Sequence, residues 1–110
     1  MSVSTQRVAV VTGASSGIGK EAAKALAAQG WRVIALGRDP GRSAAAAAEI
    51  RSASSTGKVD MLHANLSLLA DVERVAGQIA ALTDRVDVLI NNAGGMSKAR
   101  VVTAEGLEEN

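Results

Sequence analysis

Four short apolar runs alternate with segments of helical periodicity along this chain, and this alternation constrains the fold more than any other feature. The runs cover residues 7–12, 33–36, 59–64 and 87–90. Between the first two runs, an apolar residue recurs every three or four positions until Gly30, as on one face of a helix. Parallel strands need a crossover connection, and a helix usually supplies it. The sequence therefore predicts an α/β fold in the order β-α-β-α-β-α-β, with a doubly wound parallel sheet.

Three local signals refine this prediction. Asp39-Pro40 is typical of a helix start, with Asp39 as the cap and Pro40 at the first helical position. Ser67 is the expected cap of the third helix, whose apolar positions run to Leu82. Residues 103–110 resemble the first turns of a further helix. The fourth strand would lie at an open sheet edge, so we expect another segment to cover it.

Composition excludes several classes of protein. The chain has 110 residues, which is room for one small domain spanning residues 1–110, and a formal net charge of +1. It contains no Cys, which rules out disulfides, thiol nucleophiles and Cys-ligated metals. The scattered charges form no basic stripe for nucleic acid or a membrane surface, and no metal site is indicated. Without a targeting signal, we expect a cytoplasmic protein.

The segment from Thr12 to Gly19 lies between the first strand and the first helix, and its three glycines are at positions 13, 17 and 19. Glycines let a backbone turn sharply and approach a ligand closely. The unpaired N–H groups of a helix start attract an anion. A pyrophosphate suits such a site, which favours a Rossmann-type nucleotide-binding fold. A tight turn without a ligand is the alternative.

Spacing excludes two related motifs. A P-loop has the pattern Gly-x-x-x-x-Gly-Lys-Ser/Thr, whereas here Gly19-Lys20 comes one residue too late after Gly13 and Glu21 follows. The usual dinucleotide fingerprint fits Gly17 to Ala22, but it begins too far beyond the strand. The pattern Gly-x-x-x-Gly-x-Gly describes the segment better.

Arg38 stands where many dinucleotide-binding proteins carry an acidic residue. An Asp or Glu about 20 residues beyond the glycines commonly binds the ribose 2′-OH of NAD. Here Gly37 and Arg38 occupy that region, and an arginine can bind a 2′-phosphate. The sequence therefore favours NADP(H) over NAD(H). Two alternatives stay open: Arg38 is a solvated turn residue, or the neighbouring Asp39 binds the ribose.

The segment from Asn91 to Gly94, Asn-Asn-Ala-Gly, follows the fourth strand. In a doubly wound sheet this strand lies beside the first, and ligands bind at the carboxyl ends of the strands where their order reverses. We therefore expect this segment and the glycine turn to face one crevice. Asn92 is equally suited to bridging two strands.

Together, the Thr-Gly-x-x-x-Gly-x-Gly turn and the Asn-Asn-Ala-Gly segment resemble the short-chain dehydrogenase/reductase family over essentially the whole chain. The Gly-Arg-Asp after the second strand and residues 103–108 are similar to its retinol-dehydrogenase-like subgroup. The resemblance implies a nucleotide site in which the glycine turn binds the pyrophosphate, Arg38 the 2′-phosphate, Asn65 and Leu66 the adenine, and the last segment the ribose. The implied cofactor-binding residues are Gly13, Ser15, Ser16, Gly17, Ile18, Gly19, Arg38, Asn65, Leu66, Asn91, Ala93 and Gly94.

The sequence departs from the family pattern in two ways. Asn65 replaces the usual Asp, although an amide can still accept a hydrogen bond. The family's catalytic Tyr, the Lys four residues later and an upstream Ser are missing, and the 110 residues contain no Tyr at all. His63 has no partner in any motif, and we interpret it as a partly buried structural residue. We therefore expect no catalytic residue in these 110 residues, and we interpret them as the front part of a longer chain, with an unusually small binding domain as the alternative.

The resemblance implies an NADP(H)-dependent oxidoreductase that interconverts a small-molecule carbonyl and an alcohol by hydride transfer, of which this chain is the cofactor-binding part. We expect the full-length protein to be a homo-oligomer. The alternative is a non-catalytic NAD(P)-binding redox sensor or regulatory module. A Tyr-x-x-x-Lys downstream would favour the enzyme, and its absence the sensor.

Overall fold

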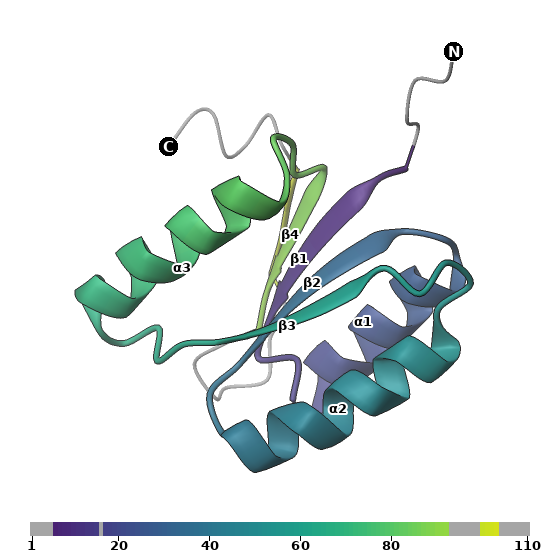
Figure 1. Ribbon diagram of the computed structural model, residues 1–110, viewed down its shortest axis with the longest axis horizontal. Coiled ribbons are helices and arrows are strands. Elements are labelled where there is room, and N and C mark those ends of the chain that lie inside the picture. Colours follow the sequence, from purple (N-terminus) through teal and green to yellow (C-terminus); the bar gives the residue numbers. More distant parts are fainter. Residues whose placement is uncertain (1–5, 16, 93–99, 104–110) are drawn as a thin grey trace.

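The computed structural model describes residues 6–15, 17–92 and 100–103. These residues form five strands and three helices (Figure 1), and the first seven elements follow the order that the alternating pattern predicts. The elements are β1 (Val8–Thr12), α1 (Gly17–Ala28), β2 (Arg32–Gly37), α2 (Pro40–Ala53), β3 (Val59–His63), α3 (Leu69–Leu82), β4 (Val88–Asn91) and β5 (Arg100–Thr103). Each of the four expected strands lies within one or two residues of its predicted bounds.

The strands form one sheet in the order β3-β2-β1-β4-β5. The first four are parallel, and Val10 of β1 is in register with Ile34 of β2 on one side and Leu89 of β4 on the other. Strand order therefore reverses at β1, and the prediction of a doubly wound α/β fold is confirmed. This reversal places the carboxyl ends of β1 and β4 side by side.

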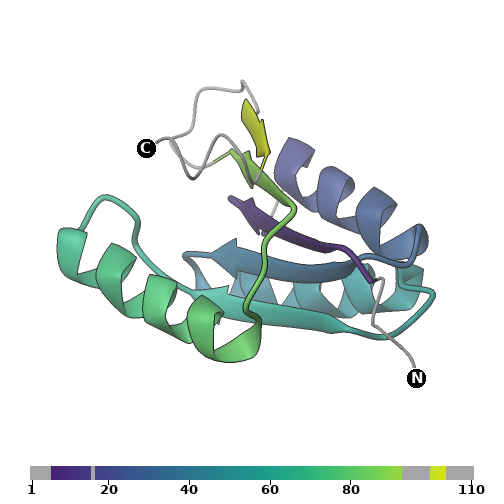
Figure 2. The same cartoon turned by 90° about the horizontal axis from the view of Figure 1, so that it is seen from above.

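Helices cover both faces of the sheet, α1 and α2 on one face and α3 on the other (Figure 2). Successive strand residues point to opposite faces. In β2, Val33 and Ala35 accordingly belong to the core under α1 and α2, whereas Ile34 and Leu36 belong to the core on the α3 side. One buried strand thus contributes to two separate apolar layers.

The two predicted helix starts after β2 and β3 differ in outcome. Asp39 caps α2 as predicted: its Oδ1 accepts hydrogen bonds from the N–H groups of Gly41 and Arg42, and Pro40 is the first helical residue. The predicted cap of α3 is wrong, because the helix begins after Leu68 without a side-chain cap. The hydroxyl of Ser67 donates to Asn65 instead.

The last described segment corrects one expectation and confirms another. Thr103 does not begin a helix; it is the final residue of β5 and pairs with Val88 in antiparallel register. The β-branched sequence Val-Val-Thr at this point favours a strand over a helix. Residues 104–110 of the expected helix lie outside the described residues. The expectation that another segment covers the edge of β4 is confirmed, since β5 pairs with it.

Candidate functional site

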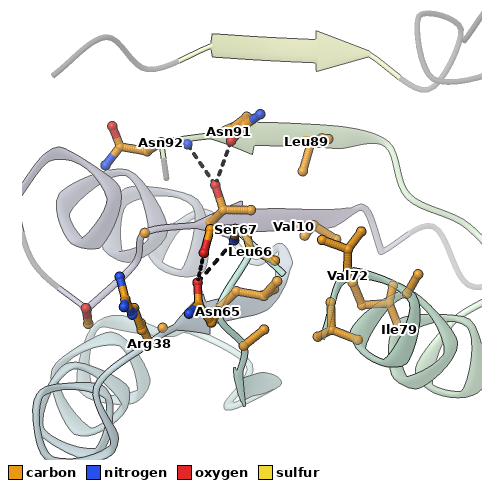
Figure 3. Close-up of a pocket in the computed structure, with 18 of the residues that line it drawn as sticks. Val10, Arg38, Asn65, Leu66, Ser67, Val72, Ile79, Leu89, Asn91 and Asn92 are labelled. Atoms are coloured by element: carbon orange, nitrogen blue, oxygen red, sulfur yellow. Dashed lines mark hydrogen bonds between the residues drawn. The ribbon is translucent and has the colours of Figure 1, made fainter. Parts of the chain in front are cut away.

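A cleft of about 1010 Å³ opens at the carboxyl ends of the parallel strands, on the face of the sheet that carries α3 (Figure 3). Its polar part contains residues that follow the strands and residues of the glycine turn. Its apolar part lies between α3 and the sheet. The described lining residues are Val10, Thr12, Gly13, Ser15, Gly17, Ile18, Leu36, Gly37, Arg38, Ala64, Asn65, Leu66, Ser67, Val72, Val75, Ala76, Ile79, Leu89, Asn91 and Asn92.

The glycine turn takes a backbone path that other residues adopt with difficulty. Gly13 and Gly17 have φ angles of 62° and 60°, in the left-handed region that favours glycine. Between them, the N–H of Ala14 donates to the carbonyl oxygen of Leu36 at 3.0 Å, which holds the turn against the end of β2. The turn therefore brings the start of α1 beside the residue that follows β2.

Gly19 is buried inside the turn and does not line the cleft. A Cβ built on Gly19 would collide with the carbonyl oxygen of Gly13 and would lie 2.9 Å from Nδ2 of Asn92. Only glycine lets α1 approach the end of β1 this closely. Gly19 therefore shapes the turn, and its contact with a ligand stays a prediction.

Thr12 joins the carboxyl ends of β1 and β4. Its Oγ1 accepts a hydrogen bond from the N–H of Asn92 at 2.8 Å and donates to Oδ1 of Asn91 at 3.1 Å, along the dashed lines that meet these two labelled residues in Figure 3. The backbone of Asn92 therefore bridges the two strands, in agreement with the bridging alternative. Thr12 was missing from the predicted site, although it opens the Thr-Gly motif that pointed there.

Arg38 is the only charged residue among the described residues that line the cleft. It is exposed, and its side chain has no hydrogen bond or ion pair in the part of the chain that the structure describes. The neighbouring carboxylate of Asp39 is occupied at the start of α2, where the N–H groups of Arg42 and Gly41 lower its pKa. The cleft thus presents one unpaired cation and, among its described lining residues, no carboxylate.

Asn65 lies two residues beyond the end of β3 and is one of the polar residues that line the cleft. Its Oδ1 accepts hydrogen bonds from the N–H of Ser67 at 3.1 Å and from the Ser67 hydroxyl at 2.6 Å. Its backbone N–H donates to Oδ2 of Asp71 at 2.8 Å. The side-chain oxygen of Asn65 is therefore engaged within the protein by Ser67.

The structure brings most of the predicted site residues together. Eight of them line the cleft: Gly13, Ser15, Gly17, Ile18, Arg38, Asn65, Leu66 and Asn91. Ser16, Ala93 and Gly94 lie outside the described residues. Ser67 was predicted only as a helix cap, but the Asn-x-Ser spacing is also that of an Asx turn, which is the signal that would have found its contact with Asn65.

His63 departs from its predicted environment. The sequence interpretation placed it in a partly buried position, but its side chain is exposed at the end of β3. Its backbone oxygen accepts a hydrogen bond from Arg74. The reason is positional: β3 is the outermost strand on its side of the sheet, and His63 is its last residue.

Two features are absent from the described residues. No cluster of three or more His, Asp or Glu side chains with the geometry of a metal site occurs among them. Within the same residues, no helix has both the length and the apolar character needed to cross a bilayer.

Comparison with known proteins agrees with this geometry. The chain is 38% identical over 102 residues to human retinol dehydrogenase 13, a match that covers 93% of this chain and 31% of that protein. Among solved structures, it is similar to an actinorhodin polyketide ketoreductase with NADPH, at 33% identity and a TM-score of 0.76 over 86% of this chain and 35% of the other. A Pseudomonas aeruginosa RhlG/NADP complex matches at 36% identity and a TM-score of 0.73, over 83% and 36%.

The chain spans about a third of the length of the relatives that it matches. The sequence profile of one family, described as short chain dehydrogenase, matches residues 7–109. The chain therefore belongs to the short-chain dehydrogenase family.

Proposed function

We propose that this chain binds NADP(H) in the cleft and forms the cofactor-binding part of an oxidoreductase that interconverts a carbonyl and an alcohol. The observation that carries the proposal is the charge pattern of the cleft. Arg38 is its only charged described lining residue, and the nearest candidate for binding a ribose hydroxyl, Asp39, is engaged at the start of α2. An unpaired guanidinium favours a phosphate over a hydroxyl group.

The residues of the cleft fit a dinucleotide phosphate. The first N–H groups of α1 have no intrahelical acceptor, and those of Gly17 and Ile18 form no hydrogen bond with another described residue. With Gly13 and Ser15, they would hold the pyrophosphate. Arg38 would bind the 2′-phosphate, Asn65 and Leu66 would flank the adenine, and Asn91 would contact the nicotinamide-side ribose.

Similar proteins support the preference for NADP(H). Two of the solved structures reported above carry NADPH or NADP according to their descriptions. A nicotinamide cofactor supplies hydride transfer when bound, and the protein supplies binding and orientation. The 110 residues contain no Tyr and no Cys. We therefore assign only cofactor-binding roles to this chain, and a small-molecule carbonyl or alcohol as substrate of the whole enzyme.

Calorimetric titration of Arg38→Ala with NADP⁺ and with NAD⁺ tests the proposal. Loss of one charge-assisted contact at an exposed site should weaken NADP⁺ binding by about tenfold. NAD⁺ lacks the 2′-phosphate, so its affinity should change by less than about twofold. Lys58→Ala removes the same unit charge from an exposed loop position outside the described lining of the cleft, and should leave both affinities unchanged. Equal weakening of both dinucleotides by Arg38→Ala would remove the 2′-phosphate role.

A further inference from the structure

The side-chain amide of Asn65 is held in one orientation. A backbone N–H can only donate, so the atom of Asn65 that faces the N–H of Ser67 at 3.1 Å must be the carbonyl oxygen, Oδ1. The Ser67 hydroxyl adds a second contact to the same oxygen at 2.6 Å. Turning the amide over would place Nδ2 against the Ser67 N–H, two donors facing each other. The hydrogen-bond network therefore assigns the two amide atoms.

This orientation leaves Nδ2 as the polar group that Asn65 offers to a ligand. Nδ2 carries two N–H donors and has no hydrogen-bond partner in the part of the chain that the structure describes. In Figure 3 the oxygen of Asn65 is turned toward Ser67, and its nitrogen lies on the side of Arg38. Both residues line the cleft. This end of the cleft thus offers hydrogen-bond donors from two side chains, without a carboxylate among the described lining residues.

A purine can meet an amide donor at only some of its edge atoms. Adenine presents an amino group at position 6, which donates, and ring nitrogens that accept. Hypoxanthine carries an oxygen at position 6, which accepts. A donor from Nδ2 thus matches the 6-oxygen of hypoxanthine, but faces the 6-amino group of adenine donor to donor and must use a ring nitrogen instead.

We propose that Asn65 is a specificity-determining residue that donates from Nδ2 to the base, so that the site accepts a 6-oxo purine at least as well as adenine. The proposal rests on the proposed function, because it requires the adenosine half of the dinucleotide to lie beside Asn65. It deepens that function by assigning the direction of one hydrogen bond to the base.

Asn65→Asp reverses that direction with almost no change in shape. One carboxylate oxygen can keep both contacts from Ser67, and the other then presents an acceptor to the base. The acceptor matches the 6-amino group of adenine and repels the 6-oxygen of hypoxanthine. Ser67→Ala is the companion variant: it removes the hydroxyl contact, keeps the backbone one, and so makes the amide easier to turn over.

The experiment compares the Kd of NADP⁺ with that of nicotinamide hypoxanthine dinucleotide phosphate for the 110-residue chain and both variants, by calorimetry. We expect the hypoxanthine dinucleotide to bind the unchanged chain at least as tightly as NADP⁺. Asn65→Asp should shift the ratio of the two Kd values by about tenfold toward adenine. Ser67→Ala should shift it in the same direction by less. A role of Asn65 in folding alone would change both Kd values together and leave their ratio constant.

Two results would overturn the inference, and they are distinguishable. If NADP⁺ binds with the expected dependence on Arg38 but the ratio is the same in all three proteins, the donor role of Asn65 fails and the proposed function stands. If neither dinucleotide binds the unchanged chain, both fail. Thermal unfolding of each variant checks that it is folded under the titration conditions.

Discussion

The two faces of the sheet are covered by helices in different ways. On one face, α1 and α2 pack closely through small side chains and bury several residues each: Gly19, Ala23 and Ala27 from α1, and Ser43, Ala46, Ala47 and Ile50 from α2. On the other face, α3 buries only Val75. The space beside α3 is the cleft, and larger apolar side chains such as Leu36, Ile79 and Leu89 line it.

This difference explains how one parallel sheet has a close-packed core on one face and a cleft on the other. Alanine and glycine let helix backbones approach the strands and each other, which leaves no room for a ligand. On the other face, the longer side chains of Leu36, Ile79 and Leu89 belong to a second apolar cluster and also line the cleft beside it. The carboxyl ends of β1 and β4 therefore lie beside a close-packed core on one face and an accessible cleft on the other.

Matched isoleucine substitutions test the contrast most strongly. Ile50 of α2 is fully buried in the close-packed core, so Ile50→Ala should lower the free energy of unfolding by about 2–4 kcal/mol. Ile79 of α3 is half-buried beside the cleft, and Ile79→Ala should cost less than about 1.5 kcal/mol, because part of its surface already meets solvent. Urea unfolding followed by the fluorescence of Trp31 measures both. Equal costs would mean that the two faces are packed alike.

Matched glycine substitutions test the close approach of α1. Gly19→Ala places a methyl group against the Gly13 carbonyl, and should destabilise the fold by about 1–3 kcal/mol. Gly77 lies in α3, and a Cβ there meets nothing within 4 Å. Gly77→Ala should therefore stabilise the fold by about 0.5–1 kcal/mol through helix propensity. If Gly19→Ala and Gly77→Ala changed the free energy of unfolding in the same direction, the difference in packing between α1 and α3 would be contradicted.

The smallest expected effect on stability concerns Asp87, which links β4 to β1. β4 is the strand that borders the cleft. Asp87 precedes β4, and Oδ2 of its carboxylate accepts a hydrogen bond from the N–H of Val8 at 2.8 Å. Hydrogen bonds from Arg85, followed by that of Val8, hold the pKa of Asp87 below its usual 3.8. The folded state therefore favours the charged carboxylate. Its contribution to stability is complete above the unfolded pKa, and is lost as the pH falls through the lowered value.

Asp87→Asn should accordingly reduce the acid sensitivity of the fold. Urea unfolding at about pH 6 and about pH 3 gives the loss of stability on acidification for each protein. We expect a smaller loss of stability in the variant than in the unchanged chain. The dependence of unfolding on urea concentration should be similar in the two proteins. An identical loss in both would show that Asp87 does not anchor β4 in the way its hydrogen bonds indicate.

Local signals made much of the fold and part of the site predictable. The apolar runs gave the strands, Asp39-Pro40 gave the start of α2, and the glycine turn indicated the cleft. The missed features depend on pairing between distant segments. Thr12 contacts residues about eighty positions away, the pairing of β5 with β4 is a tertiary contact, and the exposure of His63 follows from the position of β3 in the sheet.

Asn65 shows that the identity of one residue does not predict which of its side-chain atoms stays available for a hydrogen bond. The family resemblance identified it as an adenine contact, and an isolated amide offers both an acceptor and a donor. The hydrogen bonds from Ser67, two residues on, determine which of the two remains available. The direction of a hydrogen bond at this position thus depends on a neighbour that the sequence pattern assigned to a helix cap.

The proposed site is tested most directly by where a dinucleotide binds. Titration of the ¹⁵N-labelled chain with NADP⁺, followed by amide chemical shifts, tests it. We predict that the largest shift changes fall on Gly13, Ser15, Gly17 and Arg38, with little change at Arg7 and Trp31, which line a second, smaller hollow away from the carboxyl ends of the strands. Changes centred on that second hollow, or none at saturating NADP⁺, would contradict the account.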